Sequence, residues 1–449
     1  MKTVRLYPAN TKGKIKPLHG VGGGPLTGHF ENDATEEFIA AGIPYSRLHD
    51  IEWPFGSGEF VDIHCIFPDF DKDENDPSSY NFVLTDEYLK AIISAGTKPF
   101  YRLGNSIEQW PVKRYIHPPK DPAKWGRICS HIVSHYNDGW ADGFHMGIEY
   151  WEIWNEPELK DQNFTGTDEE MLSLYDTAAR ILKADHPDIK VGGLATCSPF
   201  TPMAETLLKM AAEDGTPLDF FSWHGYSDSP EMSAMFANKA DELLTKYGLD
   251  NVESIYDEWN YVIRWDETIG SSIRQHKTGF CASYIAAVLA TIQELRVDKA
   301  MLYDAQVKIH NWCSPFSEAP TERHAERKKV IIEKPYYALY NWNRLYRLGD
   351  EIECESDEWL YSCAARKDDE IDVIVSYFRD ADKFGISAPP DEELCFTLDG
   401  YTFEKAELYL TDNRHTNEKI EFDGRSFVMP GNSFALVRFT GCHKNGEIK

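Results

Sequence analysis

Residues 151–158 read Trp151-Glu152-Ile153-Trp154-Asn155-Glu156-Pro157-Glu158. The stretch begins as a short apolar run of the kind that forms a buried strand. It ends in an amide and a carboxylate, and the following proline cannot donate a hydrogen bond to a sheet. Because an ionised glutamate is costly to bury, a strand that stops in this way is unusual for a purely structural element. The stretch therefore indicates a strand end that carries a functional group.

A second stretch of the same design occupies residues 254–261. It reads Ser254-Ile255-Tyr256-Asp257-Glu258-Trp259-Asn260-Tyr261 and again places a carboxylate beside an aromatic residue and an amide. Two glutamates, each at the end of a strand, are what glycoside hydrolysis by paired carboxylates requires. This chemistry is the leading hypothesis from the residues alone.

Outward from these two stretches, short apolar runs alternate with longer amphipathic ones. The expected strands are 18–22, 45–48, 99–103, 150–154, 191–195, 220–223, 254–256 and 300–303. The expected helices are 34–41, 86–95, 123–136, 168–184, 203–212, 233–247, 279–295 and 335–346. The residues before two of these helices, Asn32-Asp33 and Thr167, resemble N-caps. Eight strand–helix units predict an α/β protein with a (β/α)₈ TIM barrel.

The pattern of apolar and polar residues changes after residue 346. Short alternating runs follow one another, separated by turn signals such as Asp399-Gly400 and Pro430-Gly431. We expect a C-terminal antiparallel β-sandwich at 346–449, with residues 1–12 adding a strand to it, and the catalytic barrel at 13–345. No linker separates the two parts, which favours rigid packing.

Composition narrows the possible partners. The 449-residue chain has a formal charge of −28 and a pI of about 4.9, which argues against nucleic acid, polyanionic substrates and anionic membrane surfaces. Its 12 Trp and 23 Tyr offer flat faces on which sugar rings stack. The N-terminus shows no apolar signal segment, and no run is long enough to span a membrane. Nine cysteines without a Cys-x-x-Cys pair predict reduced thiols and a cytoplasmic protein.

In a barrel of this kind the active site lies at the C-terminal ends of the strands. Polar residues cluster at the ends of the second, fourth, sixth and seventh strands: Arg47, His49, Asn155, Glu156, His224, Tyr226 and Glu258. Any one of them alone would be better explained as a surface charge or a satisfied core histidine. Convergence from four separate strands favours a site.

These residues resemble those of a known family. Trp-Asn-Glu-Pro at 154–157, Asp-Glu-Trp-Asn at 257–260, Arg47 and the His224-x-Tyr226 pair are similar to retaining glycosidases built on (β/α)₈ barrels. The segments at 15–20, 44–50 and 334–338 narrow the resemblance to glycoside hydrolase family 39, which includes β-xylosidases and α-L-iduronidases. The resemblance covers nearly the whole chain, including a β-sandwich after the barrel.

The resemblance implies that Glu156 is the general acid/base and that Glu258 is the nucleophile. Glu156 must be protonated in the first step, so we expect its pKa to be raised by aromatic neighbours such as Trp154 and by the charge of Glu258. Arg47 and the Tyr226 hydroxyl are expected to hydrogen-bond Glu258.

The remaining expected site residues would hold the sugar. Asn155 is expected to bind the sugar 2-hydroxyl. The other residues expected to line or stack on the sugar are His49, His224, Trp259, Trp110 and Tyr303. Tyr303 stands on the eighth strand, where related barrels often carry a tryptophan beneath the sugar.

No cofactor and no metal ion are expected. The glycine-rich segment at 20–25 lacks the third glycine of a dinucleotide-binding loop, because Pro25 takes its place. Asp69, Asp71 and Asp73 have the spacing of calcium ligands, but Glu74 and Tyr80 occupy the positions of the required glycine and glutamate.

The sequence therefore predicts a retaining exo-glycosidase that acts on short neutral oligosaccharides or glycosides, with β-xylosidase as the first expectation. An endo-glycanase and an arabinose- or galactose-specific glycosidase of the same family remain alternatives, and an iduronidase ranks lower because its substrate is anionic. A transglycosylase would share the covalent intermediate. A catalytically silent glycan-binding barrel would be expected to lack one glutamate, and both are present. The sequence is compatible with a homo-oligomer.

Overall fold

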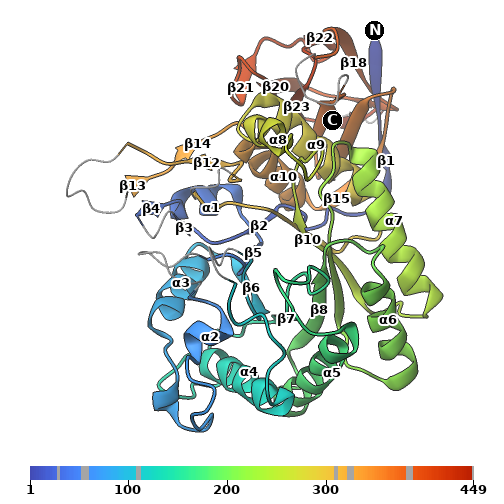
Figure 1. The fold of residues 1–449 in the computed structure, drawn as a ribbon. Helices are drawn as coiled ribbons and strands as arrows, with labels where there is room; N and C mark the ends of the chain where they lie inside the picture. The colour runs from blue at the N-terminus through green and yellow to red at the C-terminus, as the bar shows by residue number, and fades with distance from the viewer. Residues whose placement is uncertain are drawn as a thin grey trace.

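The computed structural model describes residues 1–27, 31–51, 60–107, 113–307, 312–320, 328–380 and 388–446. A closed barrel of parallel strands forms one part of the molecule, and a nine-stranded sheet forms the other (Figure 1). The described helices include none that is long and apolar enough to cross a bilayer.

The barrel has the strand order β10-β11-β2-β5-β6-β7-β8-β9 and is closed. The predicted (β/α)₈ fold is therefore confirmed, and each of the eight expected runs overlaps one barrel strand. The strands are β2 (Gly20–Gly22), β5 (Tyr45–Arg47), β6 (Lys98–Leu103), β7 (Tyr150–Ile153), β8 (Lys190–Thr196), β9 (Phe220–His224), β10 (Glu253–Trp259) and β11 (Lys299–Leu302).

Helices surround the barrel at the expected positions. They are α1 (Thr35–Ala41), α3 (Val83–Ser94), α4 (Pro122–Asn137), α5 (Asp168–Asp185), α6 (Pro202–Asp214), α7 (Pro230–Lys246), α9 (Gly279–Gln293) and α10 (Tyr336–Leu348). Two short helices were not expected, α2 (Ile63–Ile66) and α8 (Ile269–Gln275), and a 3₁₀ turn, η1, spans Pro77–Ser79.

The two expected N-caps have different outcomes. Thr167 caps α5 in a reciprocal capping box, accepting from the Glu170 backbone at 3.2 Å while Glu170 accepts from the Thr167 backbone at 2.8 Å. At α1 the N-cap residue is Ala34, and its side chain makes no capping bond. Asn32 and Asp33 instead form the short strand β4. Asp33 accepts from the Thr35 backbone.

Side chains inside the barrel lie in layers. A buried apolar cluster is made of Tyr45, Phe100, Tyr150, Phe220, Ile255 and Met301. Two residues further along five of these strands stand Arg47, Arg102, Glu152, Ser222 and Asp257, all buried. Since residues i and i+2 of a strand share a face, this polar layer lies inside the barrel directly beyond the apolar one.

The C-terminal part is one sheet of order β21-β20-β23-β17-β16-β15-β1-β18-β22. All pairings are antiparallel except that of β1 with β18, which is parallel. A single buried cluster draws residues from β20, near one edge, and from β22, at the other, so the sheet curls around a core of its own. The strands are β1 (Lys2–Lys14), β15 (Asp350–Ser356), β16 (Leu360–Lys367), β17 (Glu370–Tyr377), β18 (Glu392–Leu398), β20 (Lys405–Thr411), β21 (Glu418–Ile420), β22 (Ser426–Met429) and β23 (Ser433–Thr440).

Three small sheets complete the described strands. They are formed by β3 (Leu26–Thr27), β4 (Asn32–Asp33) and β13 (Lys328–Lys329), by β12 (Phe316–Ser317) and β14 (Ile331–Ile332), and by β19 (Tyr401–Thr402) and β24 (His443–Lys444).

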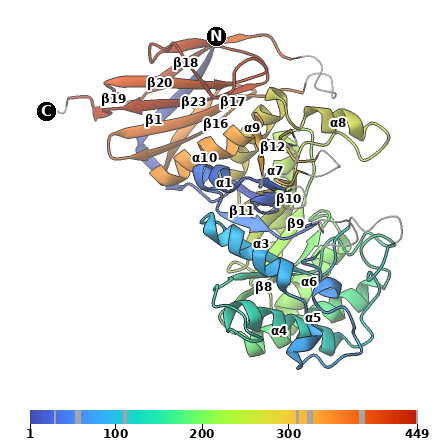
Figure 2. The same ribbon diagram turned by 90° about the vertical axis from the view of Figure 1, so that its left-hand side faces the viewer.

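Helices α9 and α10 lie between the barrel and the C-terminal sheet (Figure 2). One buried cluster includes Ile285 of α9, Leu339 of α10 and Ile374 of β17, so a continuous core joins the two parts. Across the same junction Ser376 donates to the Ser283 carbonyl at 2.7 Å. The barrel and the C-terminal sheet are therefore joined by one continuous hydrophobic core.

Candidate active site

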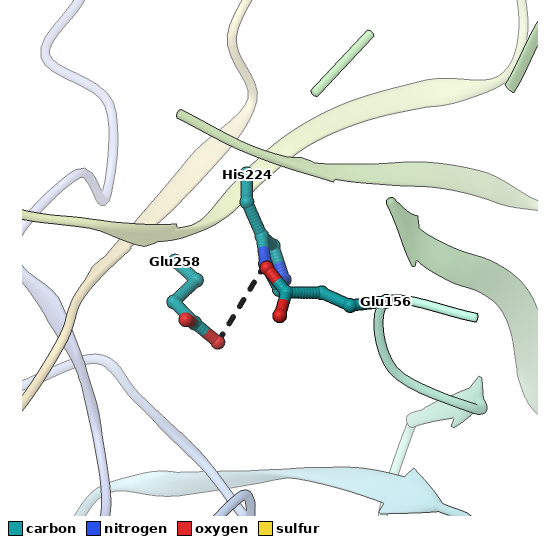
Figure 3. A group of neighbouring side chains, drawn as sticks. All are labelled: Glu156, His224 and Glu258. Carbon is teal, nitrogen blue, oxygen red and sulfur yellow. Dashed lines mark hydrogen bonds and ion pairs between the residues drawn. The ribbon is translucent and has the colours of Figure 1, made fainter. Parts of the chain in front are cut away.

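The predicted polar residues meet at the C-terminal end of the barrel. Arg47 ends β5, His224 ends β9, and Glu258 is the next-to-last residue of β10. Glu156 stands three residues after the end of β7. Figure 3 shows that Glu156, His224 and Glu258 point toward one another from three elements.

These three side chains are within contact distance. Nδ1 of His224 lies 2.7 Å from Oε1 of Glu156 and 3.7 Å from Oε2 of Glu258. A nitrogen or oxygen atom of each of the three lies within 4.8 Å of those of the other two. The two carboxyl groups therefore lie close to each other, with the imidazole of His224 beside both.

Glu258 is held by two donors. Arg47 donates from Nη1 to Oε2 at 3.0 Å, and the Tyr226 hydroxyl donates to Oε1 at 2.6 Å. Arg47 also donates from Nη2 to Oδ1 of Asn155 at 2.7 Å, which orients the amide. Nδ2 of Asn155 is buried and has no hydrogen-bond partner among the described residues, so this donor is available to a ligand.

A register shift in β10 explains how Asp257 and Glu258 both reach the interior side of the strand. Pairing with β9 slips between Tyr256 and Glu258, as in a β-bulge. Strict alternation would send one of these two carboxylates outward. The bulge keeps both inside, and Trp259 then turns to the outer face.

Burial raises the pKa of Glu156 to about 7. The Cys197 thiol and the charge of Arg47 oppose this rise, and the charge of Asp50 adds to it. The direction agrees with the expectation. The main cause is loss of solvent rather than the charge of Glu258.

Burial also raises the pKa of Glu258, although His224, Arg47 and the Tyr226 hydroxyl oppose the rise. Burial lowers the pKa of His224 to about 4, so its imidazole is neutral near pH 7. A neutral ring can exchange one hydrogen bond with Glu156 without competing for the charge of either glutamate.

Two further predicted residues lie together on the rim around Asp50. The Tyr303 hydroxyl donates to Oδ2 of Asp50 at 2.7 Å, and Nε2 of His49 lies 3.3 Å from the same oxygen. Asp50 itself was not singled out in the sequence. Its position directly after His49 at a strand end is the signal that could have identified it.

The structure contradicts the expected stacking of Trp259 on a sugar ring. Its side chain is fully buried and packs beside Tyr256 and beside Tyr284 of α9, between the barrel and its helices. Trp110, the alternative stacking residue, lies outside the described residues.

Two other tryptophans lie beside the site. Trp265 is 64% exposed, its ring centroid is 4.9 Å from that of Tyr226, and it stacks on Trp312 at 5.4 Å. Trp265 lies in the segment after β10, where no periodic pattern points to it. An exposed indole next to the residue that binds Glu258 can serve as a platform for a sugar ring.

Backbone strain is concentrated at the same strand ends. Trp154, Glu156 and Asp50 have φ angles of 71°, 45° and 52°, a region that residues other than glycine seldom adopt. Such strain is typical of functional sites, where the surrounding structure holds a side chain in one direction.

The compactness of Glu156, His224 and Glu258 would also suit a metal ion by distance alone. Their atoms are engaged by one another, by Arg47 and by Tyr226, so hydrogen bonding explains the arrangement and we assign no metal to it. In the acidic loop, Oδ1 of Asp69 accepts from the Asp71 backbone and Oδ1 of Asp73 from the Asn75 backbone, as in ordinary turns.

Comparison with known families gives one match over most of the chain. The model of glycosyl hydrolases family 39 matches residues 2–342. A curated β-xylosidase of Caldicellulosiruptor saccharolyticus is 27% identical over 231 residues, which cover 48% of this chain and 47% of the relative. A curated β-xylosidase of Geobacillus stearothermophilus is 28% identical over 203 residues, covering 42% of this chain and 39% of the relative. The chain thus spans less than half the length of the curated relatives it matches.

Solved structures share the fold over nearly the full length. A glucosidase from Croceicoccus marinus has a TM-score of 0.76 at 21% identity, covering 98% of this chain and 99% of that one. A monomeric β-xylosidase from Caulobacter crescentus CB15 has a TM-score of 0.70 at 16% identity, with the same coverage. An α-L-arabinofuranosidase from Thermotoga maritima has a TM-score of 0.67 at 14% identity, also with that coverage.

Proposed function

Because this chain belongs to glycosyl hydrolases family 39 and is therefore a glycoside hydrolase with a carbohydrate substrate, we propose that it is a retaining exo-β-xylosidase. In this proposal Glu156 is the general acid/base and Glu258 is the nucleophile. The mechanism is argued from the two glutamates, and the identity of the sugar is argued separately.

The separation of the two carboxyl groups is the observation that carries the proposal. Retaining glycosidases hold them about 5–5.5 Å apart, whereas inverting enzymes leave about 6.5–9.5 Å for a water molecule. An oxygen of Glu156 and an oxygen of Glu258 lie within 4.8 Å of each other. This closeness lies on the retaining side of the division and supports double displacement.

In the first step Glu258 attacks the anomeric carbon while Glu156 gives its proton to the leaving oxygen. The attacking oxygens are oriented by Arg47 and Tyr226, which also favour the ionised form. Glu156, with a pKa of about 7, holds its proton in the free enzyme at mildly acidic pH.

In the second step the glycosyl–enzyme ester is hydrolysed. Glu258 carries no charge while it is esterified, and Glu156, now ionised, takes a proton from the attacking water. A pKa near neutrality allows one carboxyl group to serve as acid and then as base.

Asn155 would bind the sugar beside the reacting carbon. Its Nδ2 group is the available donor, and its Oδ1 atom is fixed by Arg47, so the amide presents an N–H to the sugar 2-hydroxyl. A hydrogen bond at this position strengthens as the oxocarbenium ion develops. His49, His224 and Tyr303 would line the same sugar.

The choice of xylose rests on the two curated relatives, both β-xylosidases, and on the charge of the chain. A formal charge of −28 disfavours anionic sugars such as iduronate and leaves neutral ones unaffected. The nine cysteines all lie in the described part of the chain and are free thiols, which supports a cytoplasmic location and short, imported substrates.

A panel of aryl glycosides tests the proposal, with β-xyloside, α-L-arabinoside, β-glucoside, α- and β-galactosides and α-L-iduronide assayed on wild type and Glu258→Ala. We expect the wild type to turn over the β-xyloside and Glu258→Ala to be inactive on every sugar. Glu156→Ala should still form the intermediate from a good leaving group and should be rescued by azide.

If the wild type hydrolyses a different sugar and Glu258→Ala does not, the xylosidase assignment is wrong and the assignment of Glu258 as nucleophile stands. Wild-type rates in both variants would overturn the mechanism. Activity only on longer, internal linkages would identify an endo-glycanase, and oligosaccharide products formed with sugar acceptors would identify a transglycosylase.

A further inference from the structure

A pair of buried carboxyl groups lies directly beneath the proposed catalytic residues. Glu152 belongs to β7 and Asp257 to β10, and both are essentially inaccessible to solvent. Each stands two residues beyond the apolar layer inside the barrel, so both enter the same polar layer. Neither takes part in the mechanism described above.

Arg47 lies between this pair and the site. Its Nε atom carries one hydrogen, which it donates to Oε2 of Glu152 at 2.8 Å. Nη1 donates to Glu258 and Nη2 to Asn155. The guanidinium therefore spans the layer, with one edge on Glu152 and the other on the proposed nucleophile.

Asp257 has a different environment. Its Oδ2 atom lies 2.9 Å from Arg47 Nε, but the hydrogen on that nitrogen points to Glu152. Neither oxygen of Asp257 receives a hydrogen bond from the residues that the structure describes, and Oε1 of Glu152 receives none either. A buried carboxylate without a donor, next to a second carboxylate, would be strongly unfavourable.

A single proton on Asp257 removes both the repulsion between the two carboxylates and the lack of a hydrogen-bond donor between them. A protonated Asp257 is neutral, and its hydroxyl can donate to Glu152, which then remains ionised opposite Arg47. Burial and the neighbouring charge of Glu152 raise the pKa of Asp257 well above its usual range. Burial opposes ionisation of Glu152 as well, but Arg47 and hydrogen bonds from Asp257 and Ser222 lower its pKa.

The charged and titratable groups that face the pair come from three strands. Arg47 of β5 is the cation, and Glu258 of β10 is a further anion. His224 of β9 has Nε2 at 3.7 Å from Oδ1 of Asp257, and its low pKa keeps it neutral. Ser222 of β9 contributes a hydrogen bond to Glu152.

We propose that Asp257 retains a proton and donates it in a hydrogen bond to Glu152, and that this carboxyl pair positions Arg47 for the nucleophile Glu258. Both residues are positioning residues, because they act through Arg47 and do not touch the substrate. The role for the nucleophile depends on the proposed function, whereas the proton on Asp257 does not.

The proton limits the negative charge around Arg47. With Asp257 neutral, Arg47 is balanced by Glu152 and by Glu258. If Asp257 were ionised, a third carboxylate would compete for the same guanidinium and would stand next to the nucleophile in the chain, disfavouring its ionised form.

Infrared spectroscopy tests the proton directly, because a protonated carboxyl group has a C=O stretching band separate from that of carboxylates. We would use Glu156→Gln at pH 8 as the reference, so that the acid/base does not contribute. The reference should show a buried, protonated band that shifts in D₂O, and Glu156→Gln/Asp257→Asn should lack it. An identical band in the two proteins would overturn the proposal.

Glu156→Gln/Glu152→Gln provides a second comparison, should the asparagine variant not fold. A glutamine amide can donate to Asp257, which should then release its proton and become the partner of Arg47. The band should disappear here too. If the band persisted in this variant, Asp257 would not share its proton with Glu152.

Activity tests the positioning role with three variants of the otherwise wild-type enzyme. Glu152→Gln and Asp257→Asn each leave one negative charge within the carboxyl pair, whereas the double variant leaves none in the pair and only Glu258 opposite Arg47. We expect the double variant to lose about tenfold or more in kcat/KM beyond the product of the single losses, a coupling of the size found for contacting residues. Losses that simply multiply would overturn the positioning role.

The pH profile separates this role from a merely structural one. The double variant leaves Arg47 opposite Glu258 alone, so the acid limb of kcat/KM should move to lower pH, and a general loosening would not move it. The two proposals can fail separately. If the Glu156→Gln reference shows the protonated band but Glu258→Ala is still active, the proposed nucleophile is wrong and the proton on Asp257 stands.

Discussion

At the scale of single residues, Glu156 and Glu258 lie in different surroundings although they face each other. Glu258 accepts from a guanidinium and a phenol, which favour its ionised form. Glu156 exchanges a hydrogen bond with a neutral histidine and has a pKa of about 7. Two carboxyl groups whose surroundings differ in this way can act as nucleophile and acid.

Tyr226→Phe removes one of these donors. Because a hydrogen bond to a charged group is worth about 1.5–3 kcal/mol, kcat/KM should fall by about 10- to 100-fold. The hydroxyl lowers the pKa of Glu258, so the acid limb of the kcat/KM profile should move to higher pH in the variant. An unchanged limb would contradict the role of this contact. The control is Tyr247→Phe at the C-cap of α7, which removes a hydroxyl that donates to Glu205 at 3.1 Å, away from the site.

Glu156→Gln tests the raised pKa through stability. The protonated form of Glu156 is favoured in the folded protein, so its contribution is fully present below the unfolded pKa of 4.5 and is lost as pH rises through about 7. Glutamine has no such dependence. Denaturant unfolding should show the variant gaining about 3 kcal/mol relative to wild type between pH 4.5 and pH 8. If the free energy of unfolding changed with pH in the same way in both proteins, Glu156 would not be a buried group that retains its proton.

At the scale of secondary structure, the apolar runs predicted the barrel strands because alternation and run length are local properties. The short helices α2 and α8 were missed because four to seven residues carry too little periodicity. Strand β15 (Asp350–Ser356) shows no apolar run, because more than half of its residues are acidic and it gains its place from pairing with the distant strand β1. Such pairing cannot be read from a local pattern.

In the candidate site, too, some residues could be predicted from local patterns and others could not. Residues at strand ends were identified because the barrel fold brings those ends together. Trp259 was misplaced because unbroken alternation from Ile255 would direct it into the barrel, whereas the bulge that brings Glu258 inside turns Trp259 outward and is invisible in the sequence. Glu152 and Asp257 could have been flagged as charges within apolar strands.

The capping box of α5 gives a prediction at this scale. Thr167→Ala removes the side chain that accepts from the Glu170 backbone, and loss of an N-cap costs about 1 kcal/mol. Urea unfolding should show a drop of this size. Ser173→Ala, at an exposed position within the same helix, should change stability by less than half as much. Equal effects would contradict a role for the cap.

At the scale of the whole molecule, the barrel and the C-terminal sheet share one core through α9 and α10. The sequence indicated this only by the lack of a linker. The curl of the sheet and its continuous hydrogen bonding from β21 to β22 depend on long-range pairing. They could not be predicted from turn signals.

Gly279 tests the junction. It begins α9, and a Cβ atom there would lie 2.4 Å from the backbone carbon of Asp412 in the C-terminal part. Gly279→Ala should therefore force the two parts to shift, destabilising the protein by about 1–3 kcal/mol. Gly270→Ala in α8 is the control, because its nearest neighbour is the end of Arg274 at 3.5 Å. Similar melting temperatures for the two variants would contradict tight packing at the junction.

The nucleophilic role of Glu258 can be tested most directly by trapping the glycosyl–enzyme. The enzyme would be incubated with the 2-deoxy-2-fluoro glycosyl fluoride of the sugar that it hydrolyses, then digested and analysed by mass spectrometry. The account predicts one fluorosugar per chain, attached to Glu258 within the segment 254–261. A label on any other residue, or no label on an enzyme that turns over the parent glycoside, would contradict it.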